Sequence, residues 1–357
     1  MRSGSSSSAA RSWLGAASII AGYAALSCAS TAMAQELKTF RFMFPVESVN
    51  QYHPFYIADE LGFFKEEGIT VVFADAGGSS AAIQQVIAGN AEAALPAPSA
   101  FLNAVGQGYD LKWISSYQYS NIFTLASSAS SGIKTIADLK GKKVGVSDLS
   151  GGEVPLVRAV LTEAGLAEGD VQLVPVGDGS ALTVESLRTG QVDAYSSSLF
   201  DIAAIQAQGI EMNTILPQEA KDFPANGIVV TAEALKADPA LYEGFLRAVA
   251  KGISYAAAND AKAFEMAKKI RPEEFEVEAV ATANWAAAHT LKTPPQALTD
   301  KPIGTHFVEG FQAYHDFLRT GSEEEGGLAA DVDLSKALDS SLIEAANNFD
   351  KAKVAAQ

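Results

Sequence analysis

Four short stretches of the chain place small polar residues directly before an expected helix, an arrangement that can bind a small polar solute. They are "NQYH" at residues 50–53, "AGGSSAA" at 76–82, "PAPSAF" at 96–101 and "SDLSGGEVP" at 147–155. Glycines let a ligand approach the backbone, and a serine hydroxyl or a free helical N–H can donate a hydrogen bond to it. None of these stretches is a phosphate loop, because no Gly-Lys-Ser or Gly-Lys-Thr follows.

These stretches, together with tyrosines that can stack on a flat solute, give the predicted ligand-contacting residues. For each serine alone, helix capping is the competing interpretation, and for the histidine it is a structural role. No catalytic residue, metal ligand or cofactor is predicted. The predicted contacts are Gln51, Tyr52, His53, Gly78, Ser79, Ser80, Ser99, Tyr117, Ser150, Gly151, Gly152, Tyr195, Ser198 and Asn226.

Acidic residues dominate the segments expected to face the ligand. They are Glu47, Asp148, Glu153, Asp178 and Asp222, against only Lys112 and Lys221. No arginine falls there, although a planar anion ordinarily favours a bidentate arginine. Helix N-termini can hold an oxyanion without one. We therefore expect a pyrimidine-like heteroaromatic or an amine-bearing solute, taurine included, in preference to nitrate or a simple sulfonate.

Hydrolytic motifs are missing from the sequence. It contains no G-x-S-x-G and no H-E-x-x-H. The histidines other than His53 lie in a helical C-terminal region, so a Ser-His-acid triad would depend on His53 alone. The sequence therefore favours binding without covalent chemistry.

The elements that must position these residues follow a repeated strand–helix–strand order. β-rich runs at 40–46, 70–75, 91–97 and 111–118 alternate with helices at 54–61, 80–88 and 98–105. A second series has runs at 121–128, 142–148, 170–176 and 192–198, with helices at 153–164, 181–189 and up to about 208. A last strand ends near 231, and the remainder is helical. Such alternation predicts two α/β units, each built on a mostly parallel sheet.

The helix expected at 54–61 has a specific position relative to the ligand. Pro54 suits the first helical position, and Gly62 and Gly68 end the two helical pieces before the next strand. Ligands of open α/β sheets bind beyond the carboxyl ends of the strands. We therefore expect the free N–H groups of this helix to point into the ligand crevice, with residues 50–53 lining it.

The first 34 residues are typical of a secretory signal peptide. Arg2 and Arg11 are the only charges, an apolar stretch follows, and "AMA" at 32–34 precedes Gln35. An uncleaved membrane anchor is the alternative, and lipid attachment at Cys28 is disfavoured because the expected leucine is misplaced. Cleavage would remove the only cysteine and change the formal net charge from −16 to −18, because Arg2 and Arg11 are lost. Such a charge argues against nucleic-acid binding.

The order and spacing of four motifs carry a family resemblance. "YHPFYIADELGFFKEEGITV" (52–71), "AGGSSAAIQQVIAGNAEAAL" (76–95), "TIADLKGKKVGVS" (135–147) and "GQVDAY" (190–195) resemble the substrate-binding proteins of ABC importers in the nitrate, sulfonate, taurine and pyrimidine group, often called NMT1/THI5-like. The resemblance covers roughly residues 40–260. It implies a two-lobed periplasmic-binding-protein fold, type II-like, with a ligand cleft between lobes joined by two crossings.

The resemblance also implies a function and a domain layout. We expect a monomeric periplasmic receptor that delivers its solute to an ABC permease and its ATPase. The layout is a signal peptide at 1–34, lobe I at 36–119, lobe II at 120–224 and the rest of lobe I at 225–357. Two alternatives stay open. One is a receptor for a signalling partner; the other is an enzyme like the fungal thiamine-pyrimidine synthases, which share the fold and carry a similarly placed histidine. Those synthases also carry a cysteine-rich stretch, which this chain lacks.

Overall fold

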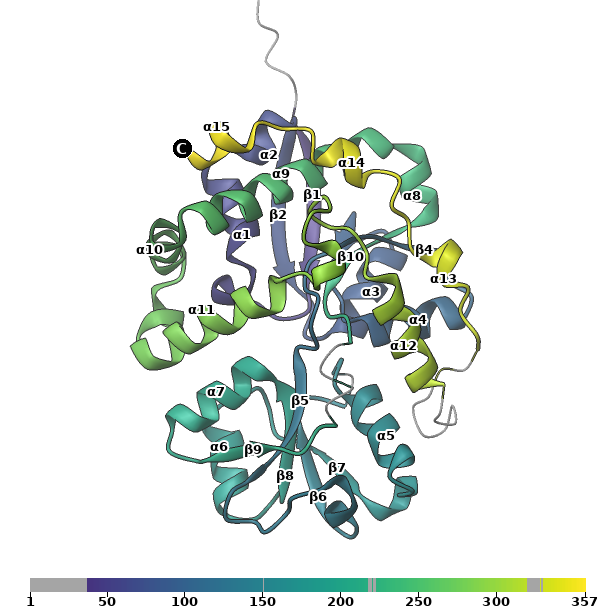
Figure 1. The fold of residues 1–357 in the computed structure, drawn as a ribbon, viewed down its shortest axis with the longest axis vertical. Helices are drawn as coiled ribbons and strands as arrows, with labels where there is room; N and C mark the ends of the chain where they lie inside the picture. Colours follow the sequence, from purple (N-terminus) through teal and green to yellow (C-terminus); the bar gives the residue numbers. More distant parts are fainter. Residues whose placement is uncertain (1–36, 150, 218–219, 221–222, 320–327, 329) are drawn as a thin grey trace, which may run out of the picture. The chain divides into compact units, whose positions relative to one another are not determined.

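The computed structural model describes residues 37–149, 151–217, 220, 223–319, 328 and 330–357. The expected signal peptide, Ser150, Lys221 and Asp222 therefore lie outside the described residues. The described strands form two five-stranded sheets, with strand orders β2-β1-β3-β10-β4 and β7-β6-β8-β5-β9 (Figure 1). We call the sheets, with the helices that cover them, the first and second lobes.

The first sheet is parallel except for β10, which runs antiparallel to β3 and β4. In β1, Phe40, Phe42 and Phe44 alternate with more exposed residues, and all three are buried. Period-two alternation places these rings on one face of the sheet. The strands are β1 (Lys38–Phe44), β2 (Ile69–Asp75), β3 (Ala93–Ala94), β4 (Leu111–Ser116) and β10 (Gly227–Thr231).

Helices cover both faces of the first sheet. The phenylalanine face packs on α1 (Val49–Glu60), α2 (Phe63–Glu66) and α9 (Pro239–Ala258), where Phe40 and Phe245 stack with ring centroids 4.1 Å apart. The other face carries α3 (Ser79–Ile87), α4 (Pro98–Gly106) and α12 (Val308–Leu318) around Trp113. Two-sided cover explains why the strands read as nearly continuous apolar runs.

The second sheet repeats this arrangement on a smaller scale. It is parallel except for β5, which runs antiparallel to β8 and β9. Figure 1 shows α5 on one side of the sheet and α6 and α7 on the other. Its elements are β5 (Phe123–Ser128), β6 (Lys143–Val146), α5 (Val154–Glu163), β7 (Gln172–Pro175), α6 (Ala181–Arg188), β8 (Ala194–Ser198), α7 (Leu199–Ala207) and β9 (Met212–Thr214).

The chain passes between the two sheets twice. The first crossing runs from the end of β4 to the start of β5, and the second from β9 to β10. Backbone bonds tie the crossings together, because the N–H groups of Tyr117 and Gln118 both donate to the carbonyl of Asn226 at 3.0 Å. The residues at which a domain boundary should be drawn stay a prediction.

Helices after β10 pack on the first lobe. α11 lies beside α1 and reaches α7 of the second lobe. Within the described residues no helix is long and apolar enough to cross a membrane. The remaining helices are α8 (Ala232–Ala237), α10 (Asp260–Ile270), α11 (Glu278–Lys292), α13 (Leu334–Ala337), α14 (Ile343–Ala346) and α15 (Lys351–Ala355).

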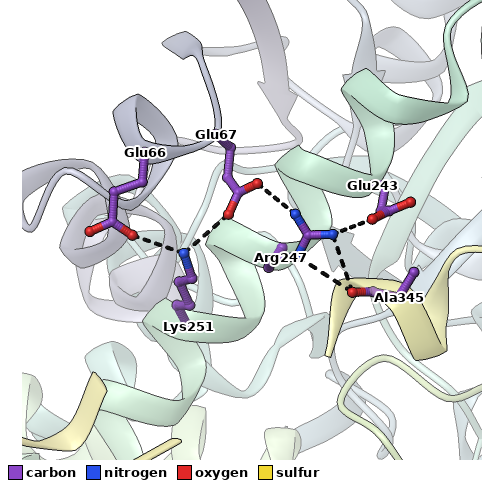
Figure 2. Close-up of polar contacts among 6 residues, drawn as sticks. All are labelled: Glu66, Glu67, Glu243, Arg247, Lys251 and Ala345. Carbon is purple, nitrogen blue, oxygen red and sulfur yellow. Dashed lines mark hydrogen bonds and ion pairs between the residues drawn. The ribbon is translucent and has the colours of Figure 1, made fainter. Parts of the chain in front are cut away.

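A chain of ion pairs fastens α2 to α9. Figure 2 shows Lys251 between Glu66 and Glu67, at 2.8 and 3.1 Å, and Arg247 bound to Glu67 at 2.7 Å and to Glu243. Arg247 also donates to the carbonyl of Ala345 in α14. The side chains of Lys251 and Glu67 are mostly buried, so water screens this network less than an exposed pair. The network therefore ties the C-terminal helices to the first motif of the sequence.

The first motif folds differently from the sequence expectation in one respect. The helix begins at Val49, not at Pro54, with Ser48 as its N-cap and a non-helical kink at Tyr52. Pro54 is tolerated because the kink interrupts the helical hydrogen bonding just before it. Gly62 and Gly68 do take positive φ angles, 78° and 75°, as expected of residues that end helices. The three-residue strand β9 was not predicted.

Candidate functional site: an acidic cavity between the two sheets

A cavity of about 630 Å³ lies between the two lobes, at the carboxyl ends of the parallel strands. We call it the acidic cavity. The first lobe contributes the start of α1, the loop before α3 and the start of α11, and the second lobe contributes the starts of α5 and α7. Its volume lies in the range of small-molecule sites. The fold therefore places a ligand-sized space where the sequence predicted a crevice.

Eight of the fourteen predicted contact residues line this cavity. They come from five separate segments of the chain, so folding brings the predicted loops together. Whether they contact a ligand stays a prediction. The eight are Gln51, Tyr52, Gly78, Ser79, Gly151, Gly152, Ser198 and Asn226.

Three other predicted residues have structural contacts instead. The hydroxyl of Ser99 donates to the carbonyl of Gly152 at 3.0 Å, which ties the lobes together. Tyr117 donates to the carbonyl of Gln51, and Tyr195 donates to the carbonyl of Gly177 at 2.7 Å. Ser80 is exposed in the first turn of α3, outside the cavity lining. The direction of each side chain depends on packing, which the local sequence does not encode.

His53 also lies outside the cavity lining, contrary to the expectation from its loop. Its ring is fully buried and stacks on Trp285 at 3.9 Å. Nδ1 lies 2.8 Å from the carbonyl of Asn50, and since a carbonyl only accepts, Nδ1 carries the proton. Nε2 then accepts from Lys292 Nζ at 2.8 Å. Burial, and next the charge of Lys292, hold the pKa of His53 well below its usual value.

The N-terminus of α1 is not available to an anionic ligand, which corrects a second expectation. Glu274 accepts from the backbone N–H groups of Val49 and Asn50, both at 2.8 Å, and from the hydroxyl of Ser48 at 3.0 Å. A carboxylate at a helix N-terminus satisfies the free donors and complements the helix dipole. The protein's own side chain thus binds the N–H groups that were expected to point, unpaired, into the ligand crevice.

The second lobe contributes three carboxyl groups, those of Glu153, Asp178 and Asp201, that form no ion pair within the described residues. Burial raises the pKa of Glu153 to about 7, although the hydroxyl and N–H of Ser147 donate to it. Burial likewise raises the pKa of Asp201 to about 6, against donation from the hydroxyls of Ser197 and Ser198 at 2.6 Å. Asp178 also has a raised pKa, from burial and then from Asp148. A cation entering here would stabilise the ionised forms.

Across the cavity, the first lobe neutralises its own carboxylates. Glu47 pairs with Arg271, and Glu274 caps α1. Among the described residues that line the cavity, six are acidic and none is a lysine, arginine or histidine. The six are Glu47, Asp148, Glu153, Asp178, Asp201 and Glu274.

Three asparagines of the first lobe add further acceptors. Asn50 and Asn226 donate through Nδ2 to the carbonyls of Ala281 and Leu95, at 3.1 and 2.8 Å. Their Oδ1 atoms, and that of Asn284, are buried without a hydrogen-bond partner. All three residues line the cavity. A buried acceptor without a donor is costly, so a ligand rich in N–H groups suits this wall.

Several of the lining residues could not be recognised from local sequence. Glu274, Val280 and Asn284 come from the C-terminal helices, more than 200 residues after the loop they face. Asp201 did carry a signal, because "SSLFD" forms a capping box in which Ser198 and Asp201 bond reciprocally. Phe200 and Phe123 provide aromatic surface from the second lobe.

Comparison with known sequences identifies the family. The sequence model described as NMT1/THI5 like matches residues 49–263. The chain belongs to this family. The match includes every strand of both sheets except β1, and most of the loops that line the acidic cavity. The resemblance seen in the four sequence motifs is thereby confirmed.

Two similar sequences illustrate the range of names among its relatives. The riboflavin-binding protein RibY of Chloroflexus aurantiacus is 28% identical over 230 residues, which are 62% of this chain and 64% of that protein. A putative thiamine biosynthesis protein of Haemophilus influenzae is 26% identical over 220 residues, 61% of this chain and 69% of that protein. The match thus spans a little under two thirds of the length of RibY.

A solved structure confirms the predicted fold class. The alkanesulfonate-binding protein SsuA of Xanthomonas axonopodis pv. citri, bound to MOPS, superposes with a TM-score of 0.65 at 14% identity, covering 86% of this chain and 99% of that one. The fold is the α/β periplasmic-binding-protein fold of two lobes joined by two crossings.

Proposed function

We propose that this protein is an extracytoplasmic solute-binding protein that delivers a small polar organic solute to an ABC permease and its ATPase. The family, the fold and the interlobe cavity support this role. The observation that carries the choice of solute is the uncompensated acidic wall of the second lobe. Among the described residues, no lysine, arginine or histidine pairs with its carboxyl groups Glu153, Asp178 and Asp201.

The solute class follows from the chemistry of the two walls. Carboxylates and unpartnered amide oxygens accept hydrogen bonds but do not donate them. Aromatic side chains, Phe123 and Phe200 among them, suit a flat ring. A heteroaromatic amine, such as an aminopyrimidine, satisfies both walls. Nitrate or a simple sulfonate would place its charge against these carboxylates, with the α1 N-terminus already capped.

The names of two relatives point in the same direction. Riboflavin contains a pyrimidine fused into a flat ring system, and thiamine carries an aminopyrimidine and a fixed positive charge. One relative is named for binding riboflavin, and another for thiamine biosynthesis. These names make flavins and thiamine-related pyrimidines the first compounds to test.

A thermal-shift screen tests the proposed solute class. The panel comprises riboflavin, thiamine, aminopyrimidines, polyamines, taurine, alkyl sulfonates and nitrate. A ligand at 100 times its dissociation constant stabilises the protein by about 2.7 kcal/mol, which raises the melting temperature measurably. We expect the largest shifts from aminopyrimidines or other amines. A shift from nitrate or an alkyl sulfonate alone would contradict the charge argument.

Capture is proposed to work by closure of the two lobes over the solute. The contact between Ser99 and the carbonyl of Gly152 shows that the lobes touch at the edge of the cavity. Burial between them excludes water and strengthens the charged hydrogen bonds. Small-angle scattering with and without the solute should show compaction. An unchanged radius of gyration with a bound solute would remove the closing mechanism.

An enzyme of thiamine biosynthesis is the second candidate, because one relative carries that name. In such an enzyme, His53 would be the reactive histidine. Its burial against Trp285, away from the cavity lining, argues against this role. Mass spectrometry distinguishes the two candidates. A binding protein returns its solute unaltered, whereas an enzyme yields a new product.

The cellular role depends on export and on the partner. Residues 1–34 are proposed to be a signal peptide cleaved near Ala34 and Gln35, which places the protein in the periplasm as a monomer. N-terminal sequencing of the protein from its native host tests the cleavage. Neighbouring permease and ATPase genes would support import, and a neighbouring sensor kinase would favour a signalling receptor instead.

A further inference from the structure

A second cavity, of about 540 Å³, lies in the first lobe beside the first crossing. We call it the basic cavity. It is lined by the C-terminal end of α11, by α9, and by residues 298, 299 and 301–303. Tyr117 and Tyr119 of the crossing contribute to it as well. It shares none of its described lining residues with the acidic cavity.

The charged residues of this cavity are all basic. Its described lining includes His289, Lys292, Lys301 and Lys351, and no aspartate or glutamate. This is unexpected in a chain with 42 acidic and 26 basic residues. A cavity lined by one sign of charge focuses its potential inward, because its walls are less polarisable than water.

Lys292 is the main source of positive charge inside the cavity. It is the last residue of α11, where the free carbonyls of a helix end favour a cation. Its Nζ donates to Nε2 of His53 at 2.8 Å, and no ion pair of Lys292 occurs among the described residues. Burial lowers the pKa of Lys292 to about 7, with Asp260 acting weakly in the other direction. A buried cation held only by a neutral imidazole lacks a counterion.

The other basic residues stand at the edge of the cavity and have partial compensation. Nε2 of His289 lies 2.9 Å from Oδ1 of Asp260. Lys301 and Lys351 are exposed, and both also border a neighbouring groove that contains acidic residues. They would attract an anion to the mouth, while Lys292 would hold it.

We propose that the basic cavity is a second binding site, distinct from the solute site, which takes a small oxyanion such as sulfate, phosphate or a carboxylate. The anion accepts hydrogen bonds from Lys292 inside the cavity, and Lys301 and Lys351 balance its remaining charge at the mouth. The hydroxyl of Tyr119 is a further donor in the lining, whereas that of Thr293 already donates to the carbonyl of His289 at 3.1 Å. Because Tyr117 and Tyr119 belong to the crossing, an occupant would contact the connection between the two lobes.

The site should weaken as the pH rises. Several titratable groups face Lys292 or its neighbours: His53 from α1, His289 on α11, Asp260 at the start of α10, Lys301 and Lys351. Only the protonated form of Lys292 attracts an anion. Anion binding therefore falls as the pH passes upward through about 7, the value to which burial brings the pKa of this lysine.

Isothermal titration of the full-length mature protein with sodium sulfate, at constant ionic strength maintained with sodium chloride, tests the proposal. Wild type should bind one sulfate at pH 6, at least tenfold more tightly than at pH 8.5. Lys292→Met should weaken binding at least tenfold, and Lys292→Arg should retain it. Lys269→Met, an exposed lysine on α10, is the matched control and should bind as wild type does.

A further variant and two further anions allow the proposal to be tested even if the first variant does not fold. Should Lys292→Met fail to fold, as judged by circular dichroism, the exposed pair Lys301→Ala with Lys351→Ala should still weaken sulfate binding severalfold. Phosphate and acetate serve as alternative probes. No binding of any of the three anions to wild type, or equal binding to Lys292→Met, would overturn the proposal. The solute site stays testable separately, because its ligand should bind Lys292→Met with unchanged affinity.

Discussion

The two cavities of this protein have similar volumes and opposite charge. The acidic cavity, of about 630 Å³, has six carboxyl groups and no basic residue in its described lining, whereas the basic cavity, of about 540 Å³, has three lysines and a histidine and no carboxyl group. Helix α1 borders both, with Asn50 on the acidic side and Pro54 on the basic side. The negative net charge of the chain alone favours an amine-bearing ligand. The local arrangement of charges favours such a ligand in the acidic cavity and an oxyanion in the basic cavity.

His53 lies between the two cavities and forms a hydrogen bond with a lining residue of each. Its Nδ1 donates to the carbonyl of Asn50, which lines the acidic cavity, and its Nε2 accepts from Lys292, which lines the basic one. A neutral imidazole can serve both neighbours, since one nitrogen donates and the other accepts. The comparison therefore assigns to His53 a structural role that maintains the difference between the cavities.

The largest expected effect is loss of solute affinity when the acidic wall loses a charge. Glu153→Gln keeps the shape of the side chain and removes its charge. A hydrogen bond to a charged group contributes about 1.5–3 kcal/mol, so affinity for the cationic solute should fall roughly 10- to 100-fold. Titration calorimetry measures this, with Glu163→Gln, exposed on the same helix, as the control. Equal affinity in both variants would contradict an acidic solute site.

The lysine inside the basic cavity, Lys292, should make the stability of the protein depend on pH. In the folded protein the pKa of Lys292 is lowered to about 7. Above that pH the unfolded chain binds more protons at this residue than the folded one, so the free energy of unfolding rises with pH. Between pH 6 and 9, wild type should gain about 2 kcal/mol relative to Lys292→Met in urea unfolding. Lys269→Met should follow wild type, and a parallel response of Lys292→Met would show that Lys292 is an ordinary surface amine.

The solute site should respond to pH in the opposite sense from the anion site. Glu153 and Asp201 have pKa values raised to about 7 and about 6, so both are partly protonated near pH 5.5 in the empty cavity. A cationic solute favours the ionised forms, and its affinity should rise at least tenfold from pH 5.5 to pH 8. A solute that stays protonated over this range is required. Glu153→Gln should make the solute affinity less dependent on pH. A wild-type affinity that falls as the pH rises would contradict this prediction.

A smaller effect is expected where the lobes touch. A Cβ at Gly152 would lie 2.8 Å from Cζ of Phe123 and 3.0 Å from Cβ of Ala97 in the other lobe. Gly152→Ala should therefore hinder closure and weaken solute binding about fivefold, while sulfate binding in the basic cavity stays the same. Gly169→Ala is the control, because nothing lies within 4 Å of its added Cβ. Equal weakening at both sites would indicate general damage to the fold.

Residues 52 and 53 illustrate the limit of what local sequence predicts about the site. Both were predicted to face the ligand because they precede Pro54. The ring of Tyr52 borders the acidic cavity but is buried against Phe44, with centroids 4.7 Å apart, and His53 is buried against Trp285. Replacing either residue by alanine should therefore lower the melting temperature of the unliganded protein. No local pattern indicates the burial of His53, because Trp285 lies 232 positions after it.

The sequence alone determined the two α/β lobes, most element positions, the family and the loops that meet at the cavity. These follow from local causes: alternating apolar residues, glycines at helix ends, and strand ends that share one edge of a sheet. Tertiary structure alone decided that Glu274 caps α1 and that Lys292 reaches His53. It also decided which side chains turn inward at each loop. Contacts between residues more than 200 positions apart depend on how whole helices pack, and no local pattern encodes that packing.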